Sequence, residues 1–312
     1  MVVGASRGLG RQYAADLARA GARLVLTGRG NEVAAVAETI RQEGGSALAV
    51  RCDIRNPAPF VDAALKEYGA IDGLVVNAGL VRDRSFAKMS AGEWSEVIDV
   101  HLGGSFACAK AVWAPMTARG RGSIIFTTSG AGMHGAFGQA NYAAAKGGII
   151  GLMKTLAIEG ERVGIRANAI APMALTEMTD GVFSDRMKHG LLPEQISPFL
   201  LALLDPGSTR TGEIVECGGG WGAQMRWQRS ADNVQDGLNG VCESPCPQRD
   251  ARPPRRRQHR PALGPPARPR SQIARACLRR TGRTRPRCHL HAPARSERRV
   301  AGHLIRCGTA SR

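Results

Sequence analysis

Aromatic residues make up only 4% of this 312-residue chain, and its last quarter contains none. Residues 231–312 also lack Lys, while they hold 19 Arg, ten Pro and five acidic residues. A segment of this composition cannot bury enough apolar surface to offset the entropy that folding costs. We therefore expect a folded domain over residues 1–230 and a disordered Arg/Pro-rich tail over residues 231–312.

Three interpretations of this basic tail are open. The first is a solvated disordered segment, and the second is an arm that binds nucleic acid through phosphate contacts. The third is a GC-rich reading frame translated out of register. The missing aromatic side chains remove base stacking, so we expect no nucleic-acid partner. Abundant Arg, Pro, Ala and Gly without Lys are typical of a shifted frame, and we favour this frameshifted translation. The pairs Cys242/Cys246 and Cys288/His291 are too irregularly spaced for zinc, so we predict no metal site.

Cysteine and long apolar runs are scarce in the first 230 residues as well. Their three cysteines, Cys52, Cys108 and Cys217, lie far apart, which suits a reducing compartment without disulfides. The longest apolar run, Phe199–Leu204, is far too short to span a membrane. The N-terminus also lacks the charged and apolar regions of a signal peptide. We therefore expect a cytoplasmic protein with no membrane partner.

Short runs rich in Val, Ile and Leu alternate with helix-like segments along the first 230 residues. The predicted strands cover residues 2–3, 23–27, 47–52, 71–77, 123–128, 165–170 and 213–217. The predicted helices cover residues 9–20, 31–43 and 57–68, and the capping box Ser90-x-x-Glu93 opens a further long helix. This alternation predicts an α/β fold: a Rossmann-like doubly wound parallel sheet of about seven strands, with helices on both faces. Such folds bind ligands at the carboxyl ends of their strands.

A glycine-rich turn stands at the start of the chain, in the stretch MVVGASRGLG. Gly4, Gly8 and Gly10 form a G-x-x-x-G-x-G pattern between the first predicted strand and a helix. Backbone N–H groups in such a turn receive the pyrophosphate of a dinucleotide. Only three residues precede Gly4, and they span roughly 10 Å, so we expect a truncated first strand.

Two arginines near this turn bear on the choice of coenzyme. Arg7 lies in the turn, and Arg29 follows the second strand, where a fold that prefers NAD commonly has an acid and this chain has Gly28. Two guanidinium groups there suit a 2′-phosphate, so we predict NADP(H) over NAD(H); solvated surface charges are the alternative. Asp53 is expected to accept a hydrogen bond from the adenine amino group. The small residues of Asn77–Gly79 let the backbone pass close to a cofactor.

The stretch SGAGMHGAFGQANYAAAKGG contains the residues that indicate acid/base catalysis. Tyr142 and Lys146 are four residues apart on a predicted helix, so they share one face. A nearby ammonium lowers the pKa of a phenol, which is otherwise about 10, and the pair then exchanges a proton with an alcohol or ketone. Ser129 follows a predicted strand and is expected to hydrogen-bond the substrate oxygen. Tyr-x-x-x-Lys alone also arises by chance in helices, so the prediction depends on the serine and the glycine turn as well.

Together these motifs resemble those of the short-chain dehydrogenase/reductase family over residues 1 to about 230. The glycine motif, the Asn-Ala-Gly motif and the set of Ser129, Tyr142 and Lys146 match at the family's usual spacing. The phrases GQANYAAAKGG, LAIEG and NAIAP look most like the 3-hydroxyacyl-CoA dehydrogenase part of multifunctional β-oxidation enzymes. That branch usually prefers NAD and has an Asp near position 28, so NAD(H) also stays open.

The resemblance implies further roles. Lys146 would also hold the nicotinamide ribose, and Pro172 and Thr176 would lie by the nicotinamide amide. His101 stands where the family often has an Asn that holds a water in a proton relay. The apolar helical pattern from Trp94 to Phe106 turns His101 inward, so a relay role and a satisfied core histidine are both open. Family members are commonly dimers or tetramers, and we expect a homo-oligomer.

We therefore predict an NAD(P)(H)-dependent oxidoreductase that interconverts a secondary alcohol and a ketone, with a 3-hydroxyacyl thioester as the first candidate substrate. The predicted catalytic residues are Ser129, Tyr142, Lys146 and His101. The predicted cofactor contacts are Gly4, Ser6, Arg7, Gly8, Leu9, Gly10, Arg29, Asp53, Ile54, Asn77, Ala78, Gly79, Tyr142, Lys146, Pro172 and Thr176. The truncated first strand motivates the alternative, a catalytically silent relative that acts through a basic interaction tail.

Overall fold

The computed structural model describes residues 1–177, 179 and 190–228. Its strands are β1 (Val2–Val3), β2 (Arg23–Gly28), β3 (Ser46–Arg51), β4 (Gly73–Val76), β5 (Gly122–Thr127), β6 (Ile165–Pro172), β7 (Ile214–Gly218) and β8 (Trp221–Met225). Its helices are α1 (Gly8–Arg19), α2 (Glu32–Gln42), α3 (Ala58–Tyr68), α4 (Ala91–Ile98), α5 (Gly104–Ala118), α6 (Gly130–His134), α7 (Ala140–Gly160) and α9 (Ser197–Leu204). The predicted disordered tail, with the pairs Cys242/Cys246 and Cys288/His291 considered for zinc, lies outside the described residues.

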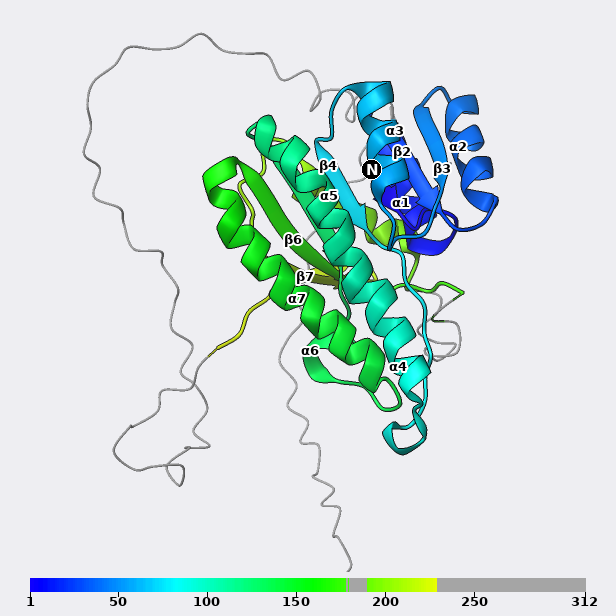
Figure 1. Cartoon of the computed structure of the whole chain (residues 1–312), viewed down its shortest axis with the longest axis vertical. Coiled ribbons are helices and arrows are strands. Elements are labelled where there is room, and N and C mark those ends of the chain that lie inside the picture. Colours follow the sequence, from blue (N-terminus) through cyan, green and yellow to red (C-terminus); the bar gives the residue numbers. More distant parts are fainter. Residues whose placement is uncertain (178, 180–189, 229–312) are drawn as a thin grey trace, which may run out of the picture. The chain divides into compact units, whose positions relative to one another are not determined.

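The strands form a single sheet in the order β3-β2-β1-β4-β5-β6-β7-β8 (Figure 1). All neighbouring pairs are parallel except β7 and β8. The predicted doubly wound parallel sheet is therefore confirmed. Its strands read as unbroken apolar runs because side chains on both of its faces are buried under helices.

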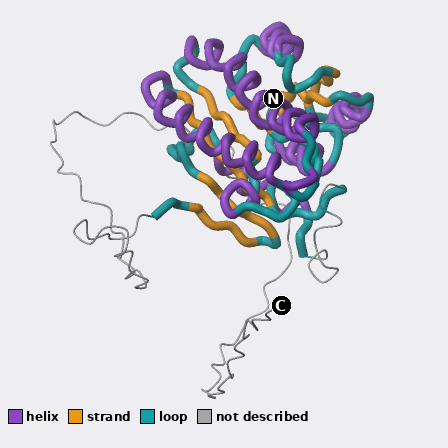
Figure 2. The backbone as a smooth tube through the Cα atoms, turned by 60° about the horizontal axis from the view of Figure 1, so that its bottom comes forward, coloured by secondary structure: helices purple, strands orange, loops and turns teal. Residues whose placement is uncertain are grey.

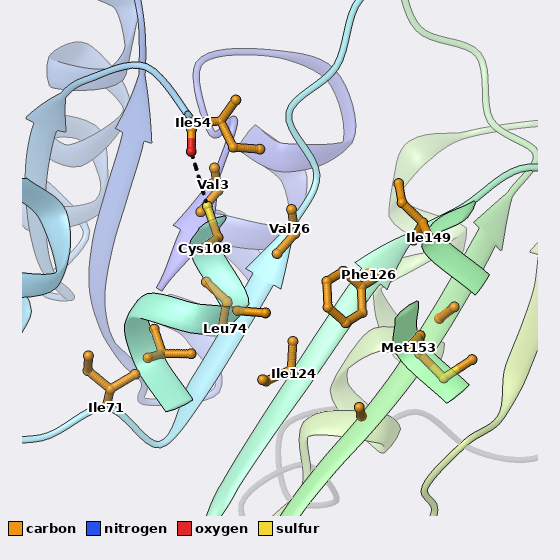
Figure 3. Packing of buried hydrophobic residues seen from close by; sticks show 14 of the residues in the cluster. Val3, Ile54, Ile71, Leu74, Val76, Cys108, Ile124, Phe126, Ile149 and Met153 are labelled. Atoms are coloured by element: carbon orange, nitrogen blue, oxygen red, sulfur yellow. Dashed lines mark hydrogen bonds between the residues drawn. The ribbon is translucent and has the colours of Figure 1, made fainter. Parts of the chain in front are cut away.

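Figure 2 shows helices packed over the strands of the sheet. Two clusters of buried apolar residues lie between the sheet and its helices. Residues of α3, α4, α5 and α7 pack on one face, where Figure 3 shows Phe126 and Ile124 of β5 beside Ile149 and Met153 of α7. Residues of α1, α2 and α9 pack on the other face, with Tyr13 fully buried among them. Helices on both faces leave the carboxyl edge of the sheet as the place where loops can gather around a ligand.

Strand β1 has only two residues, yet it lies in the middle of the sheet between β2 and β4. Val2 and Val3 are 0% and 1% exposed. Backbone hydrogen bonds continue the ladder past the strand: Val75 N donates to Met1 O at 2.9 Å, and Gly4 N donates to Thr27 O at 2.9 Å. The neighbours of this short strand therefore keep their hydrogen-bond partners.

The eighth strand, β8, was not among the predicted strands. It pairs antiparallel with β7 through a two-residue turn, in which Gly219 and Gly220 have φ angles of +59° and +76°. Two positive φ angles fit the turn type that closes tight hairpins. The segment WGAQM has few β-branched residues, so its strand conformation comes from pairing with β7 rather than from its own composition.

The predicted long helix begins at the expected place, because Ser90 and Glu93 form the capping box. It is then interrupted by a π-helical turn over Asp99–Gly103, after which α5 begins. His101 is 2% exposed, as the apolar pattern predicts. Trp94 and Phe106, however, are 40% and 56% exposed. The wider turn shifts the helical register, so the predicted apolar stripe does not continue along one face.

Two further properties concern the described part of the chain. Its three cysteines, Cys52, Cys108 and Cys217, are free thiols. None of its helices has the length and apolar composition that crossing a bilayer requires.

Candidate functional site

The glycine turn between β1 and α1 is packed so closely at Gly4 and Gly10 that neither position has room for a side chain. Gly4 has a φ of +83°, and a Cβ there would lie 2.6 Å from Ala78 Cα. A Cβ on Gly10 would collide with the carbonyl oxygen of Gly4. Helix α1 begins at Gly8, and the N–H groups of a first helical turn have no intrahelical acceptor. The turn therefore offers a compact backbone surface with N–H donors, which suits an anionic group.

Asn77 ties the end of β4 to this turn. Its Nδ2 donates to Gly4 O at 3.4 Å, and its Oδ1 accepts from Thr127 Oγ1 at 3.4 Å. Its backbone N donates to Val3 O at 3.0 Å. The carboxyl ends of β1, β4 and β5 are thus joined by a single side chain, which brings the glycine and Asn-Ala-Gly motifs together.

The residues predicted to select the coenzyme lie in the turn after β1 and at the end of β2. A Cβ on Gly28 would collide with Ser6 Oγ, so the turn packs against the position where an acid was considered. Arg7 forms an ion pair with Glu177, with 2.8 Å between Nη1 and Oε2; both side chains are largely exposed. Arg29 is exposed at the end of β2. The positive charge predicted here is therefore present, and part of it is already paired.

Asp53 is held by Arg55 through a bidentate ion pair. Arg55 Nε and Nη2 lie 2.9 Å and 2.8 Å from the two carboxylate oxygens. These hydrogen bonds are the main reason that the pKa of Asp53 falls to about 2. The neighbouring Ile54 is 5% exposed, and its carbonyl accepts a hydrogen bond from the Cys108 thiol at 3.5 Å. Asp53 is therefore a charged acceptor at neutral pH, while Ile54 packs on α5.

The predicted catalytic pair lies on the first two turns of α7. Lys146 is 3% exposed, and its Nζ lies 5.5 Å from the centroid of the Tyr142 ring. The same ammonium donates to Thr127 O at 2.6 Å. Burial lowers the pKa of Lys146 to about 7. The helix spacing thus brings the two side chains together, and the interior makes the ammonium easy to deprotonate.

Ser129 opens α6 directly after β5 and accepts a hydrogen bond from Ala131 N at 3.3 Å. Burial raises the pKa of Tyr142, the negative charge of Asp83 adds to this, and a hydrogen bond with Ser129 acts in the opposite direction. Burial outweighs the hydrogen bond, so the predicted lowering of the Tyr142 pKa is wrong. The phenol keeps its proton and can serve as a donor.

His101 lies against the Tyr142 ring. The two ring centroids are 5.2 Å apart, and the rings are perpendicular. Its Nε2 lies 2.7 Å from Leu80 O and 3.1 Å from Leu80 N. Burial and the nearby Lys146 charge lower the pKa of His101 to about 3. The structure thus places His101 with the predicted catalytic residues.

The remaining predicted cofactor residues lie at the end of β6 and on the glycine turn. Pro172 ends β6, and the methyl group of Thr176 lies 3.5 Å from the position that a Cβ on Gly8 would take. Thr176 N donates to Thr179 Oγ1 at 2.8 Å. Leu9 is partly buried against the core that α1 covers. The segment after β6 therefore borders the glycine turn.

Asn141 is a site residue that the sequence reasoning missed. It is 0% exposed, and its Nδ2 donates to Arg82 O and Glu93 O, both at 3.1 Å. Its Oδ1 accepts from Tyr142 N at 2.7 Å. Asn141 thereby fixes the first turn of α7 against α4 and the loop after β4. A polar residue directly before the tyrosine was the available signal, but its inward direction depends on tertiary contacts.

Comparisons with known proteins agree with this geometry. The family described as short chain dehydrogenase matches residues 1–187. The chain is 40% identical over 240 residues to peroxisomal multifunctional enzyme type 2 of Mus musculus. The matched region covers 74% of this chain and 33% of that protein. This chain therefore spans about a third of the length of that relative.

Two further matches cover most of the other protein. A 3-oxoacyl-[acyl-carrier-protein] reductase of a Synechocystis species is 39% identical over 236 residues, covering 70% of this chain and 95% of the reductase. The crystal structure of a short chain dehydrogenase from Mycobacterium avium superposes with a TM-score of 0.68 at 34% identity, covering 76% of this chain and 87% of that one.

Proposed function

The chain belongs to the short-chain dehydrogenase family, and on this premise we propose that it is an NAD(P)(H)-dependent oxidoreductase that interconverts a secondary alcohol and a ketone. The observation that carries the proposal is the buried Lys146 ammonium beside Tyr142, at the sheet edge where the glycine turn lies. Burying a cation costs free energy because the ammonium loses its hydration, and lysines are rarely buried to this degree.

The residues present fit a dinucleotide. A Cβ at Gly4 would collide with Ala78 and one at Gly10 with the Gly4 carbonyl, so the glycines let the turn pack tightly and present its backbone N–H groups to the pyrophosphate. Asn77 holds that turn against β4 and β5. We assign the nicotinamide ribose to Lys146 by family resemblance. A bound nicotinamide supplies or accepts the hydride at the substrate carbon.

The chain's own residues then move the proton. Tyr142 donates its proton to the substrate oxygen during reduction and takes it back during oxidation. Ser129 hydrogen-bonds the same oxygen and stabilises the charge that develops on it. Lys146, with a pKa of about 7, favours the phenolate as it forms and exchanges its own proton near neutral pH.

We propose NADP(H) as the preferred coenzyme. This chain has Gly28 where an acid would hold the ribose hydroxyls, Ser6 Oγ lies against Gly28, and Arg7 and Arg29 lie nearby in sequence. Guanidinium groups suit a phosphate monoester. Titration with NADPH and NADH, followed by cofactor fluorescence, tests the preference; tighter binding of NADH contradicts it.

A 3-hydroxyacyl or 3-oxoacyl thioester is our proposed substrate class. The reductase from Synechocystis, which this chain covers almost completely, is named for a 3-oxoacyl group on a carrier protein. The sequence resemblance to the hydroxyacyl-CoA branch adds support. A panel that compares acetoacetyl-CoA with simple ketones of equal chain length tests the class, and equal kcat/KM values contradict it.

We also propose a cytoplasmic homo-oligomer. Phe106 on α5 and Ile158 on α7 are 56% and 72% exposed, and both helices lie on the same face of the sheet (Figure 1). Exposed large apolar side chains on adjoining helices suit a second copy of the chain. Light scattering with chromatography measures the assembly, and a monomer at micromolar concentration contradicts the proposal.

The central test replaces Tyr142 with Phe, which removes the hydroxyl and keeps the ring. We expect kcat to fall about 100- to 10,000-fold, because the proton donor is lost, while NADPH binding stays unchanged. Tyr68→Phe is the matched control, since the Tyr68 hydroxyl donates to Leu24 O at 3.3 Å, away from the proposed proton donor. Retained turnover in Tyr142→Phe contradicts the proposed mechanism.

A further inference from the structure

The π-helical turn between α4 and α5 directs one buried polar ring into the site. The turn covers Asp99–Gly103, and His101 within it is 2% exposed. A Cβ on Gly79 would collide with His101 Cε1, so the ring occupies space that only glycine leaves open. The last residue of the Asn-Ala-Gly motif therefore makes room for this imidazole.

Leu80 anchors the ring through one nitrogen. His101 Nε2 lies 2.7 Å from Leu80 O and 3.1 Å from Leu80 N. One nitrogen cannot donate and accept at once, and the shorter contact favours the tautomer in which Nε2–H donates to Leu80 O and Nδ1 carries the lone pair. The perpendicular contact with Tyr142, at 5.2 Å between centroids, is a favoured aromatic geometry. The imidazole is thus fixed by the Leu80 backbone and packs against the Tyr142 ring.

The surroundings oppose a second proton on the ring. Among the described residues, no group hydrogen-bonds His101 Nδ1, and that atom is buried. On α7, which packs against the turn, the groups facing the imidazole are the Lys146 ammonium and the Tyr142 phenol. With Nε2–H donating to Leu80 O, a second proton on Nδ1 would create a buried imidazolium near the Lys146 ammonium, which is strongly unfavourable.

We propose that His101 is a positioning residue that remains uncharged throughout the reaction and holds the Tyr142 ring in place, rather than carrying a proton. The inference rests on the proposed function of Tyr142. It separates His101 from the relay role considered from the sequence. It also accounts for the bracing of the ring at Nε2 by the Leu80 backbone.

Nuclear magnetic resonance of the full chain with ¹⁵N-labelled histidine tests the charge state without any need for turnover. The chain has seven His, and the His101 signals are identified as those that shift most in Tyr142→Phe, because that change alters the neighbouring ring. We expect the His101 nitrogens to keep the shifts of a neutral imidazole from pH 5 to pH 9. Titration of these signals within that range overturns the proposal.

Kinetics test the positioning role. We expect His101→Gln to lower kcat about 10- to 100-fold through misplacement of the phenol, with the KM for the coenzyme and the shape of the kcat–pH profile unchanged. His134→Gln is the matched control, because His134 is exposed on α6. Unchanged kcat in His101→Gln, or the loss of one limb of the pH profile, overturns the proposal. A wild-type chain without turnover would instead refute the proposed function and leave the resonance experiment decisive for His101.

Discussion

The coenzyme region and the catalytic region share one edge of the sheet but hold their charges in different ways. In the coenzyme region, Arg7 pairs with Glu177, and Asp53 pairs with Arg55. All four side chains are at least partly exposed to solvent, and pairing with Arg55 lowers the pKa of Asp53 to about 2. In the catalytic region, Lys146 is 3% exposed, donates to a backbone carbonyl, and has a pKa that burial lowers to about 7.

This difference separates two ways of controlling charge. Exposed ion pairs exchange partners easily, because water and salt compete for each member. A buried ammonium has no such substitute, so its protonation responds to any change in its surroundings. We therefore expect substitutions in the catalytic region to have large effects and those on exposed pairs of the coenzyme region to have small ones.

The largest effect on kcat is expected for Lys146→Met. It removes the buried ammonium and keeps the length of the side chain, and we expect kcat to fall about 100- to 10,000-fold. Lys154→Met is the matched control, because Lys154 lies two turns along α7 and also donates to a backbone carbonyl, that of Gly212 at 2.5 Å. Steady-state kinetics measure both variants. Equal losses in the two would show that the effect is structural.

Gly10→Ala tests how tightly the glycine turn is packed. The added Cβ would collide with the Gly4 carbonyl, and we expect a loss of about 2–4 kcal/mol in the free energy of unfolding together with weaker NADPH binding. Gly151→Ala on α7 is the control, since among the described residues outside the adjoining backbone of its own helix no atom lies within 4 Å of its added Cβ. Alanine should stabilise that helix by roughly 0.5–1 kcal/mol. Urea unfolding measures whether the free energy of unfolding falls in Gly10→Ala and rises in Gly151→Ala.

The pH dependence of stability sharpens the contrast further. Burial lowers the pKa of Lys146 from 10.5 to about 7, so the unfolded chain binds more protons than the folded chain between these values. The stability contributed at this position therefore rises with pH from about 7 toward 10.5, by at most about 1.4 kcal/mol per pH unit. The free energy of unfolding of the wild type should rise relative to that of Lys146→Met between pH 7 and pH 9. A difference independent of pH would contradict the burial argument.

The smallest effect is expected at the exposed ion pair of the coenzyme region. Glu177→Gln frees Arg7 to meet a phosphate, and we expect NADPH to bind about two- to fivefold more tightly, with a smaller change for NADH. Glu38→Gln removes a similar exposed pair with Arg41 on α2 and serves as the control. Fluorescence titration at low salt measures the change. Weaker NADPH binding in Glu177→Gln would show that Glu177 supports the site instead of competing for Arg7.

Local spacing made much of the molecule predictable. Seven strands, the glycine turn, the capping box at Ser90 and the shared face of Tyr142 and Lys146 all follow from residues within a few positions of one another. Hydrogen bonding and side-chain direction over one turn or one strand obey fixed periods, so short stretches of sequence specify them.

What the sequence by itself determined about this protein is therefore the alternation of its elements and the residue types at the carboxyl edge of its sheet. Only the tertiary structure decided that β8 pairs with β7, that Arg7 meets Glu177 and that the His101 ring fills the space above Gly79. It also reversed the expected direction of the Tyr142 pKa. These features depend on burial and on contacts between distant segments, and both arise only once the chain has folded back on itself.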